Sequence, residues 1–467
     1  MEGESSAVVS QQALQDRFGL PVAFSLRASL DDQADPLAGL LEAVGKAGGR
    51  LGQIQLAEQQ HGKTVYDLQL FVKDDEHLRQ VAAAAEGVTG VEAVALTDLA
   101  MESHRGGACE MRSRTPIRSN TDLRIVYTPG VARVCKAIQA DPAKARQFTN
   151  VANKVAIATN GTAILGLGDI GPLAGLPVME GKAAIFWEFA GISAEPILID
   201  TRDPGEFVSV MEKLACGFGA IQIEDVAAPA CFQITRELDR RLNIPVFHDD
   251  QHGTATIVLA GLYAALKTTG RKIHQIRVAI SGAGAAGTAI AEILQLAGVD
   301  DVVLCDRGGV LYPGRRENMN PEKAALAERT NKDNVKGTLA DAMRGRGLFV
   351  GVSQAGLVSK EMVRSMAADP IVFALANPVS EISVADAYQA GAAVAADGRI
   401  MNNALAYPGI FRGALDAAAE SITTDMLMAA AKALAALVPQ RQLMPEMMDR
   451  ATHHAVAAAV MQVAGQA

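Results

Sequence analysis

Two pairs of neighbouring carboxylates each directly follow an apolar stretch of the chain. Glu224-Asp225 comes after residues 220–223, and Asp249-Asp250 comes after residues 244–248. Each pair is therefore predicted at the C-terminal end of a strand, where open α/β sheets bind their ligands. Because successive strand residues point to opposite faces, two adjacent ligands require the strand to break at that point.

Converging carboxylates repel one another unless a divalent cation binds them. A cation held only by oxygen ligands is more typically Mg²⁺ or Mn²⁺ than Zn²⁺. Spacing alone leaves a second interpretation open, in which these acids cap helices or lie on the surface. His248 and His252 flank the second pair and are expected to orient or pack rather than to bind a metal.

Two further side chains are candidates for proton transfer. Lys182 lies just ahead of an apolar run, and desolvation near a metal would lower its pKa and make it a base near neutral pH. Tyr127 precedes the turn Thr128-Pro129-Gly130 and is a candidate proton donor. A surface cation and a packing tyrosine are the alternatives. His453-His454, in an Ala-rich helix, are expected to be solvated.

A dinucleotide fingerprint follows later in the chain. Gly282-Ala283-Gly284-Ala285-Ala286-Gly287 matches G-x-G-x-x-G and lies between an expected buried strand (276–280) and an expected helix (288–296). The glycines permit a tight turn, approach of the backbone to a pyrophosphate, and close packing of helix on strand. A second strand, 302–305, ends in Asp306, near the ~20-residue offset of a carboxylate that binds the ribose hydroxyls.

Asp306 would repel a 2′-phosphate, which favours NAD over NADP, although Arg307 could instead bind that phosphate. A second G-x-G-x-x-G, Gly166 to Gly171, is followed by a stretch with prolines at 172 and 177. We expect that stretch to be unable to carry a long helix, so this match is interpreted as a turn in a different pocket.

The elements that position these residues predict an α/β protein of several domains. Residues 22–97 read strand, helix, strand, strand, helix, strand, which is the ferredoxin-like pattern, with a hairpin at His61-Gly62. The expected organisation is a disordered tail (1–20), a small α+β domain (21–100), a linker (101–115), a substrate and metal domain (116–271), a Rossmann-type dinucleotide-binding domain (272–425) and C-terminal helices (426–467).

Composition excludes several classes of protein. The 467 residues carry 43 Lys+Arg against 52 Asp+Glu, a net charge of −9, which argues against a nucleic-acid groove or a polybasic membrane surface. No stretch approaches the ~20 apolar residues of a spanning helix, and the start lacks the pattern of a secretory signal. The five scattered cysteines fit a reducing cytoplasm and exclude a thiolate metal site.

The motifs, in their order, resemble those of malic enzymes of the small bacterial type over roughly residues 105–425. They are Tyr127-Thr128-Pro129-Gly130-Val131-Ala132, Gly166 to Pro172, Glu180-Gly181-Lys182, Glu224-Asp225, Phe247 to Thr254, Phe373 to Pro378, Asn402-Asn403 and Tyr407-Pro408-Gly409. The resemblance implies oxidative decarboxylation of L-malate to pyruvate and CO₂, dependent on NAD(P) and on Mg²⁺ or Mn²⁺.

The resemblance also implies roles for individual residues. Glu224, Asp225 and Asp250 would bind the metal, which acts as a Lewis acid. Asp249 would help to hold Lys182, the base that takes the C2 hydroxyl proton, and Tyr127 would protonate C3 of the enolate. The substrate carboxylate would be bound by Asn377, Asn402 and Asn403, with Asn377 also a candidate contact of the nicotinamide ribose.

Two departures from the family pattern matter. Residues 163–165 (Ala-Ile-Leu) replace the Arg with which larger malic enzymes anchor malate, so the partner of the second malate carboxylate is open. Residues 21–98 resemble an ACT domain, with Asp35-Pro36-Leu37-Ala38 as its ligand turn, but Leu37 replaces the usual Gly. This domain is expected either to bind a small effector such as an amino acid or only to dimerise.

The expected assembly is a homodimer or a higher homo-oligomer, with no nucleic-acid or membrane partner. Two other functions compete with the leading one. One is an NAD-dependent amino-acid dehydrogenase, which needs no divalent metal. The other is a non-catalytic, nucleotide-binding regulator built around the ACT-like domain.

Overall fold

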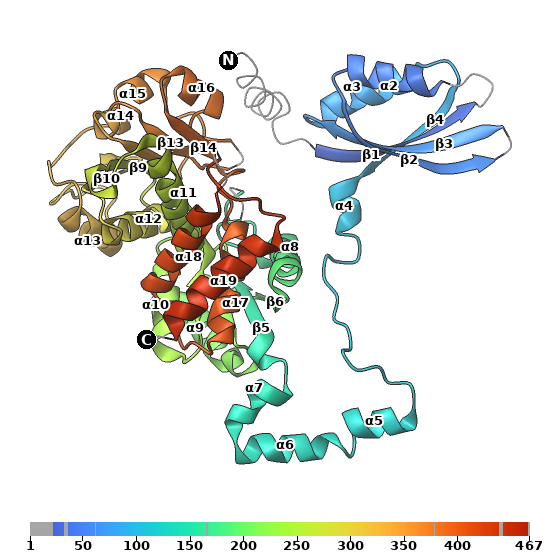
Figure 1. Cartoon of the computed structure of the whole chain (residues 1–467), viewed down its shortest axis with the longest axis horizontal. Coiled ribbons are helices and arrows are strands. Elements are labelled where there is room, and N and C mark those ends of the chain that lie inside the picture. Colours follow the sequence, from blue (N-terminus) through green and yellow to red (C-terminus); the bar gives the residue numbers. More distant parts are fainter. Residues whose placement is uncertain are drawn as a thin grey trace. The chain divides into compact units, whose positions relative to one another are not determined.

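A computed structural model describes residues 22–31, 36–60, 62–164, 167–377, 379–438 and 442–465. The chain forms two compact units, residues 1–108 and 109–467 (Figure 1). The predicted tail, Asp35 of the ACT-like turn, His61 of the hairpin, Gly166 and Pro378 lie outside the described residues.

The first unit has two helices on one face of an antiparallel sheet with the order β2-β3-β1-β4. Its elements are β1 (Val22–Asp31), α2 (Leu37–Lys46), β2 (Arg50–Gln60), β3 (Lys63–Val72), α3 (Asp75–Glu86), β4 (Val91–Asp98) and α4 (Leu99–Ser103). Alternate residues of β1 are buried, as the period of a strand with one covered face requires. Asp74 caps α3 by accepting a hydrogen bond from the His77 amide (2.8 Å). This order of strands and helices is the predicted one.

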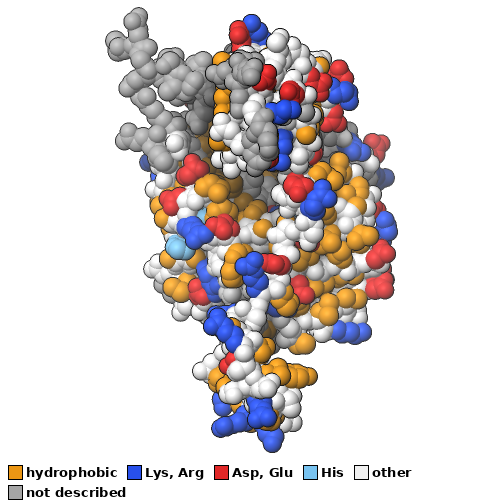
Figure 2. Space-filling model, turned by 90° about the vertical axis from the view of Figure 1, so that its right-hand side faces the viewer, with side chains coloured by type: hydrophobic (Ala, Val, Ile, Leu, Met, Phe, Trp, Pro, Cys, Tyr) orange, Lys and Arg blue, Asp and Glu red, His pale blue; other side chains and the backbone are white. Residues whose placement is uncertain are grey.

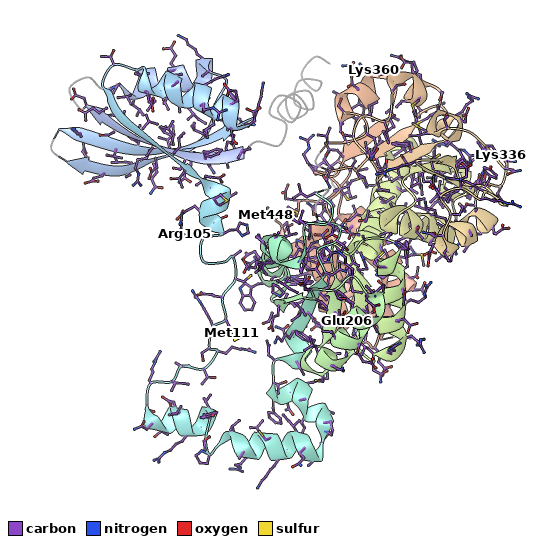
Figure 3. The ribbon with its side chains drawn as sticks, turned by 180° about the vertical axis from the view of Figure 1, so that it is seen from behind. Arg105, Met111, Glu206, Lys336, Lys360 and Met448 are labelled. Carbon is purple, nitrogen blue, oxygen red and sulfur yellow. The ribbon has the colours of Figure 1, made fainter. Side chains whose placement is uncertain are left out.

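The second unit begins with α5 (Asn120–Val126), α6 (Val131–Ala140) and α7 (Ala145–Phe148), which we call the arm. None of the residues in these three helices is buried, and α5 and α6 lie away from the sheets (Figure 1). Figure 2 shows apolar side chains between Lys and Arg side chains on this projection at the bottom of the molecule. Met111, on the segment that leads into the arm, is 91% exposed (Figure 3).

A parallel sheet with the order β6-β5-β7-β8 follows the arm. Its elements are β5 (Lys154–Thr159), α8 (Pro172–Ala190), β6 (Ser193–Leu198), α9 (Pro204–Leu214), β7 (Ala220–Ile223), α10 (Ala230–Arg241), β8 (Val246–His248), the π-helical turn η4 (Asp249–Gly253) and α11 (Thr254–Thr269). The central strands are continuous buried runs because helices cover both faces of a parallel sheet.

The 19-residue helix α8 corrects the prediction that the stretch after Gly171 cannot carry a long helix. Pro172 occupies the first turn, where no intrahelical N–H is needed. Pro177 lies inside the helix, and the helix continues because Met179, Phe186 and other side chains on one face bury against the core. Tertiary packing therefore outweighs the local cost of this proline.

The other sheet of the second unit has the strand order β11-β10-β9-β12-β13-β14. This is the 3-2-1-4-5-6 order of a Rossmann domain. The strands are β9 (Arg277–Ser281), β10 (Asp301–Asp306), the antiparallel β11 (Gly309–Val310), β12 (Leu348–Gly351), β13 (Ile371–Ala374) and β14 (Val394–Asp397). The helices are α12 (Ala285–Leu296), α13 (Pro321–Arg329), α14 (Leu339–Met343), α15 (Lys360–Arg364) and α16 (Val384–Gln389). The strand order reverses between β9 and β12, which is where such sheets bind dinucleotides.

The C-terminal helices α17 (Tyr407–Asp416), α18 (Thr424–Leu437) and α19 (Arg450–Ala464) join the two sheets. Phe186 of α8 makes edge-to-face contacts with Tyr407 and Phe411 of α17. One continuous core cluster includes residues from both sheets and these helices, so the strand ends of the two sheets are held in one body.

His453 contradicts the expectation that both histidines of the last helix are solvated. Its ring is 1% exposed, stacks on Phe189 with centroids 4.4 Å apart, and pairs through Nε2 with the Met447 carbonyl (2.9 Å). His454 is exposed, as expected. Neighbouring helix residues face different sides, so only one of the two can point into the core. Within the described residues, we find no helix with the length and apolar character needed to span a membrane.

Candidate active site

Three carboxylates meet at the C-terminal ends of β7 and β8. Glu224 and Asp225 follow β7, and Asp225 has a left-handed backbone (φ 50°), so the strand breaks where two adjacent ligands require it to break. Asp250 lies in η4, directly after β8. One oxygen from each of these three residues lies within 4.8 Å of the others. The structure thus brings the predicted set together, in a geometry that suits an oxygen-ligated divalent cation.

Lys182 reaches the same place from the middle of α8. Its Nζ lies 2.6 Å from Asp249 Oδ2 and 3.0 Å from Glu224 Oε1, and 5.0 Å from the centroid of the Tyr407 ring. Burial by itself lowers the pKa of Lys182, but the Asp249 and Glu224 carboxylates outweigh it and hold that pKa well above its usual value. Among these carboxylates, Lys182 is therefore an ammonium whose side chain is 17% exposed.

The site carries more buried negative charge than Lys182 can neutralise. Burial raises the pKa of Glu224 well above its usual value although Lys182 opposes this, and burial together with Asp249 raises the pKa of Asp250 to about 6. Asp249 Oδ1 is buried and has no hydrogen-bond partner in the described part of the chain. Uncompensated carboxylates and an orphaned oxygen are what a divalent cation would relieve, so these residues fit the metal that the sequence predicts.

The two histidines beside the carboxylates are neutral at physiological pH, because burial lowers the pKa of each to about 4. His252 Nδ1 accepts a hydrogen bond from the His248 amide (3.1 Å), which orients its ring. His248 is fully buried, and its Nδ1 lies 3.9 Å from Asp250 Oδ2. This placement agrees with orienting and packing roles, which stay predictions.

The three predicted asparagines are placed differently. Asn403 Nδ2 donates to Thr254 Oγ1 (3.0 Å) and to the Asp249 carbonyl (3.4 Å), so Asn403 adjoins the carboxylate cluster. Asn402 is exposed and caps the next turn by accepting from the Ala404 amide (2.9 Å). Asn377 is exposed on the loop that follows β13.

Tyr127 is not brought to Lys182 within this chain. It ends α5 on the arm, and its side chain is 66% exposed. The tyrosine that does adjoin Lys182 is Tyr407, which is 1% exposed and whose hydroxyl has no partner among the described residues. The sequence assigns Tyr407 no role, although the motif Tyr407-Pro408-Gly409 pointed to its segment.

The glycine fingerprint forms a cradle between β9 and α12. A Cβ on Gly282, whose φ is 109°, would lie 2.6 Å from the Val352 carbonyl oxygen, and one on Gly287 would lie 1.8 Å from the Gly282 oxygen. A Cβ on Gly284 would meet nothing within 4 Å. The first and third glycines therefore permit close packing, and the second leaves open space at the N-terminus of α12. This arrangement fits a pyrophosphate.

Asp306 ends β10 as predicted, but both of its oxygens already have cationic partners. Arg315 Nη2 lies 2.5 Å from Oδ1, and Lys323 Nζ lies 2.7 Å from Oδ2. Burial raises the pKa of Asp306, and the hydrogen bonds from Lys323 and Arg315 more than offset this and hold it below its usual value. Arg307 is exposed. The sequence interpretation missed Arg315 and Lys323 because they return to Asp306 only through the β11 turn and the start of α13.

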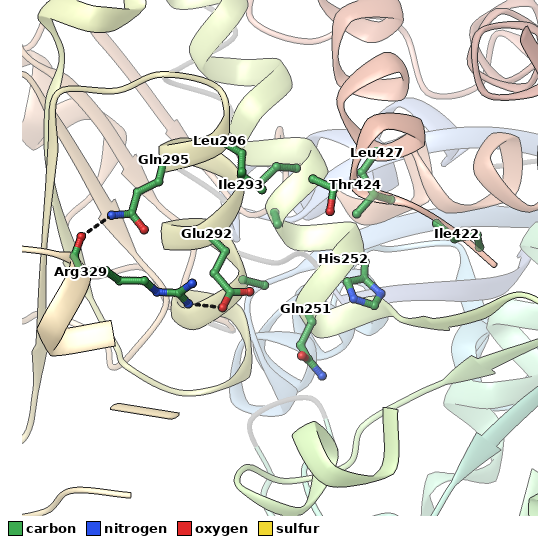
Figure 4. A pocket seen from close by; sticks show the side chains of 12 residues that line it. Gln251, His252, Glu292, Ile293, Gln295, Leu296, Arg329, Ile422, Thr424 and Leu427 are labelled. Atoms are coloured by element: carbon green, nitrogen blue, oxygen red, sulfur yellow. Dashed lines mark hydrogen bonds and ion pairs between the residues drawn. The ribbon is translucent and has the colours of Figure 1, made fainter. Parts of the chain in front are cut away.

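A separate cavity of about 480 Å³ lies between η4 and α12 (Figure 4). Gln251 and His252 line it from one side, and Glu292, which is ion-paired with Arg329, lines it from the other. None of the three clustered carboxylates lines this cavity. It is therefore distinct from the site at Lys182.

Two family domains match the second unit almost from end to end. Residues 107–239 match the malic enzyme N-terminal domain, and residues 251–401 and 396–465 match the malic enzyme NAD binding domain. The chain belongs to the malic enzyme family.

Members of the family resemble this chain over most of its length. The NAD-dependent malic enzyme of Geobacillus stearothermophilus is 43% identical over 432 residues, covering 91% of this chain and 90% of that protein, so the match extends into the first unit. The NADP-dependent malic enzyme of Rhizobium meliloti is 45% identical over 344 residues, 72% of this chain and 45% of that longer protein. The crystal structure of the NAD-dependent malic enzyme of Thermotoga maritima has a TM-score of 0.75 at 40% identity, covering 77% and 98% of the two chains.

Proposed function

We propose that this protein catalyses the oxidative decarboxylation of L-malate to pyruvate and CO₂ with a nicotinamide dinucleotide and a divalent metal. The observation that carries the proposal is Lys182, held 2.6 Å from Asp249 and 3.0 Å from Glu224, beside three carboxylates that can share one cation. Family membership and the Rossmann sheet in the same body support it.

The metal would be Mg²⁺ or Mn²⁺, held by Glu224, Asp225 and Asp250. When bound, such a cation polarises the oxygens of a 2-hydroxy acid and stabilises negative charge that develops on them. A cation bound by Glu224 would offset the carboxylate charge that raises the pKa of Lys182, and so would favour its neutral form. In that form Lys182 Nζ would take the proton of the C2 hydroxyl, and a bound nicotinamide would supply the hydride acceptor. Asp249 orients Lys182, and Asn403 binds the substrate carboxylate next to it.

A second copy of the chain supplies Tyr127, which protonates C3. The arm exposes Leu123 (44%), Ile125 (66%) and Phe148 (50%), and helices this short are not stable in water without a packing partner. The start of α8 exposes Leu173 (76%), which offers apolar surface on the helix that carries Lys182. The proposed assembly is therefore a homodimer in which arms are exchanged.

Mixing inactive variants tests this shared site. Tyr127→Phe is expected to spare malate oxidation but to block protonation at C3, and Lys182→Ala is expected to abolish oxidation, so each variant alone should fail to form pyruvate. If the arm is exchanged, a mixed dimer has one intact site, so a refolded equal mixture should regain roughly a quarter of wild-type activity, by random pairing. If Tyr127 acts within its own chain, the mixture stays inactive.

We propose NAD as the preferred cofactor. Asp306 presents a carboxylate where a 2′-phosphate would lie, and both of its oxygens are ion-paired, with Arg315 and with Lys323, so these two cations are already engaged. The first unit is proposed to be an ACT-like regulatory or dimerisation domain, with an amino acid as the class of effector to be tested. Initial rates with NAD, NADP and added amino acids, for the full chain and for a variant lacking residues 1–100, separate these possibilities.

The central experiment measures initial rates with L-malate and Mn²⁺. We expect a chelator to abolish turnover and Mn²⁺ or Mg²⁺ to restore it, which would exclude an amino-acid dehydrogenase because that class needs no divalent metal; malate turnover that survives the chelator would refute the metal's role. Lys182→Ala should lose turnover and still bind NAD. Retained function in Lys182→Ala would instead favour the non-catalytic regulator.

A further inference from the structure

Glu381 is a fully buried glutamate on the loop that follows β13. Its Oε1 accepts hydrogen bonds from the Ser353 amide (2.9 Å) and the Ser353 hydroxyl (3.3 Å), and its Oε2 accepts one from the Ala376 amide (3.2 Å). N–H groups donate to both oxygens, which is the environment of an ionised carboxylate rather than of a carboxylic acid.

This carboxylate joins the ends of three adjacent strands. Ser353 follows β12, Ala376 follows β13, and Ser353 Oγ lies 2.7 Å from the hydroxyl of Ser281, the last residue of β9. Because an ionised Glu381 only accepts, the Ser353 hydroxyl donates to it and therefore accepts from Ser281. The network thus fixes the backbone on both sides of the point where the strand order reverses.

The backbone at Gly351 leaves room for the Glu381 carboxylate. A Cβ on Gly351 would lie 2.3 to 2.6 Å from the carboxylate atoms of Glu381, so a residue with a side chain at 351 would displace it. In the described part of the chain, no Lys, Arg or His forms an ion pair with Glu381. Burial raises the pKa of Glu381 above its usual value, although hydrogen bonds from Ser353 and Ala376 oppose this rise. The buried carboxylate of Glu381 is therefore surrounded by N–H and O–H donors and, among the described residues, has no cationic side chain as a partner.

The position of the glycine fingerprint indicates which part of a dinucleotide would lie near the Glu381 carboxylate. The glycine cradle at β9 and Asp306 at β10 bind the adenosine half of a dinucleotide, so the nicotinamide half crosses to the β12 and β13 side. The oxidised nicotinamide ring is a cation and the reduced ring is neutral. We infer that Glu381 is a positioning residue for the nicotinamide loops and that its charge makes the site prefer the oxidised over the reduced cofactor.

This inference rests on the proposed function, because it requires a nicotinamide cofactor. Glu381→Gln removes the charge at nearly constant shape. Ser353→Ala is the matched control, because it loosens the same network and keeps the charge. Dissociation constants for NAD⁺ and NADH are measured with the full-length protein by calorimetry, without malate or metal, so that chemistry does not enter the result.

We expect Glu381→Gln to weaken NAD⁺ binding relative to NADH by about tenfold, because it removes a negative charge that attracts the oxidised ring and not the reduced one. Ser353→Ala should change both affinities alike and leave their ratio within about twofold. If Glu381→Gln also leaves the ratio unchanged, the electrostatic role is refuted. If the wild type binds neither form, the proposed function fails instead.

A measurement on the wild type covers the case in which Glu381→Gln does not fold. Benzamide adenine dinucleotide is an uncharged analogue of NAD⁺ with nearly the same shape. We expect it to bind about tenfold more weakly than NAD⁺. Equal binding of the two would overturn the inference.

Discussion

The fingerprint glycines Gly284 and Gly287 should respond in opposite ways to the same substitution. A Cβ on Gly287 would lie 1.8 Å from the Gly282 carbonyl oxygen, a distance that requires strand and helix to separate by more than 1 Å. A Cβ on Gly284 would meet nothing within 4 Å, and its φ of −94° suits alanine. Gly287→Ala is thus a packing defect, whereas Gly284→Ala only fills the space in which a pyrophosphate would bind.

The magnitudes follow from this geometry. Overpacking of a core costs about 1–3 kcal/mol, and here the clash is with backbone, so the upper end applies; better helix propensity returns about 1 kcal/mol. A net loss of roughly 2 kcal/mol lowers Tm by about 4–8 °C for a domain of this size class. Gly284→Ala should change Tm by less than about 1 °C and weaken NAD binding about 100-fold, because the backbone can no longer approach the phosphates.

The assay is thermal unfolding without cofactor, followed by calorimetric titration with NAD. Gly298→Ala, at a left-handed glycine after α12 (φ 94°), is a control for backbone strain away from the cradle. Wild-type NAD affinity in a folded Gly284→Ala variant would refute pyrophosphate binding at the N-terminus of α12. A wild-type Tm for Gly287→Ala would refute the packing of α12 on β9.

Five other outcomes are expected. Asp249→Asn removes one of the two carboxylates that hold Lys182 and should lower kcat for malate oxidation about 100-fold, because Lys182 is no longer fixed at the reacting hydroxyl; a loss of less than threefold would contradict the ion pair's role. Metal-free protein should lose stability as pH rises from about 4 to about 6, because an unfolded aspartate loses its proton at about pH 3.9 whereas folded Asp250, whose pKa is raised to about 6, still holds it. Mn²⁺ replaces that proton, so it should raise Tm much more at about pH 7.5 than at about pH 5, and an equal effect at both would oppose this assignment. Asp306→Ser leaves Arg315 and Lys323 without their anion and should raise kcat/KM for NADP relative to NAD at least about tenfold; an unchanged ratio would place the 2′-position elsewhere. Ile125→Glu changes a side chain that is 66% exposed in one chain, so it should be neutral in a monomer but should dissociate an arm-exchanged dimer, as sedimentation velocity would show.

Local patterns were enough to predict the backbone that carries the site. The buried run before Gly282 and the helix after it form β9 and α12, and Glu224-Asp225 and Asp249-Asp250 lie at strand ends as their preceding apolar runs indicate. These predictions succeed because strand period, glycine conformation and turn chemistry act within a few residues. The exception was α8, whose prolines argued against a helix that tertiary packing sustains.

Side-chain partners were decided by the fold. Arg315 and Lys323 reach Asp306 over 9 and 17 residues, and Lys182 reaches Asp249 over 67. Nothing in the local sequence specifies these pairs. Strand order and helix packing determine which side chains, distant along the chain, lie next to one another away from water. Tyr127 shows the same limit, since its motif predicts a proton donor and the folded chain leaves it exposed on the arm.

The sequence by itself determined the family, the α/β class, the dinucleotide fingerprint and the carboxylates that suit a metal. Each of these depends on residue types that lie a few positions apart in the chain. Only the tertiary structure decided which charged groups lie together. It places Lys182 between two carboxylates and Asp306 between two cations, and it gives Glu381 hydrogen-bond donors but no cationic partner among the described residues. Electrostatic energies depend on distance and burial in three dimensions, and neither is a property of spacing along the chain.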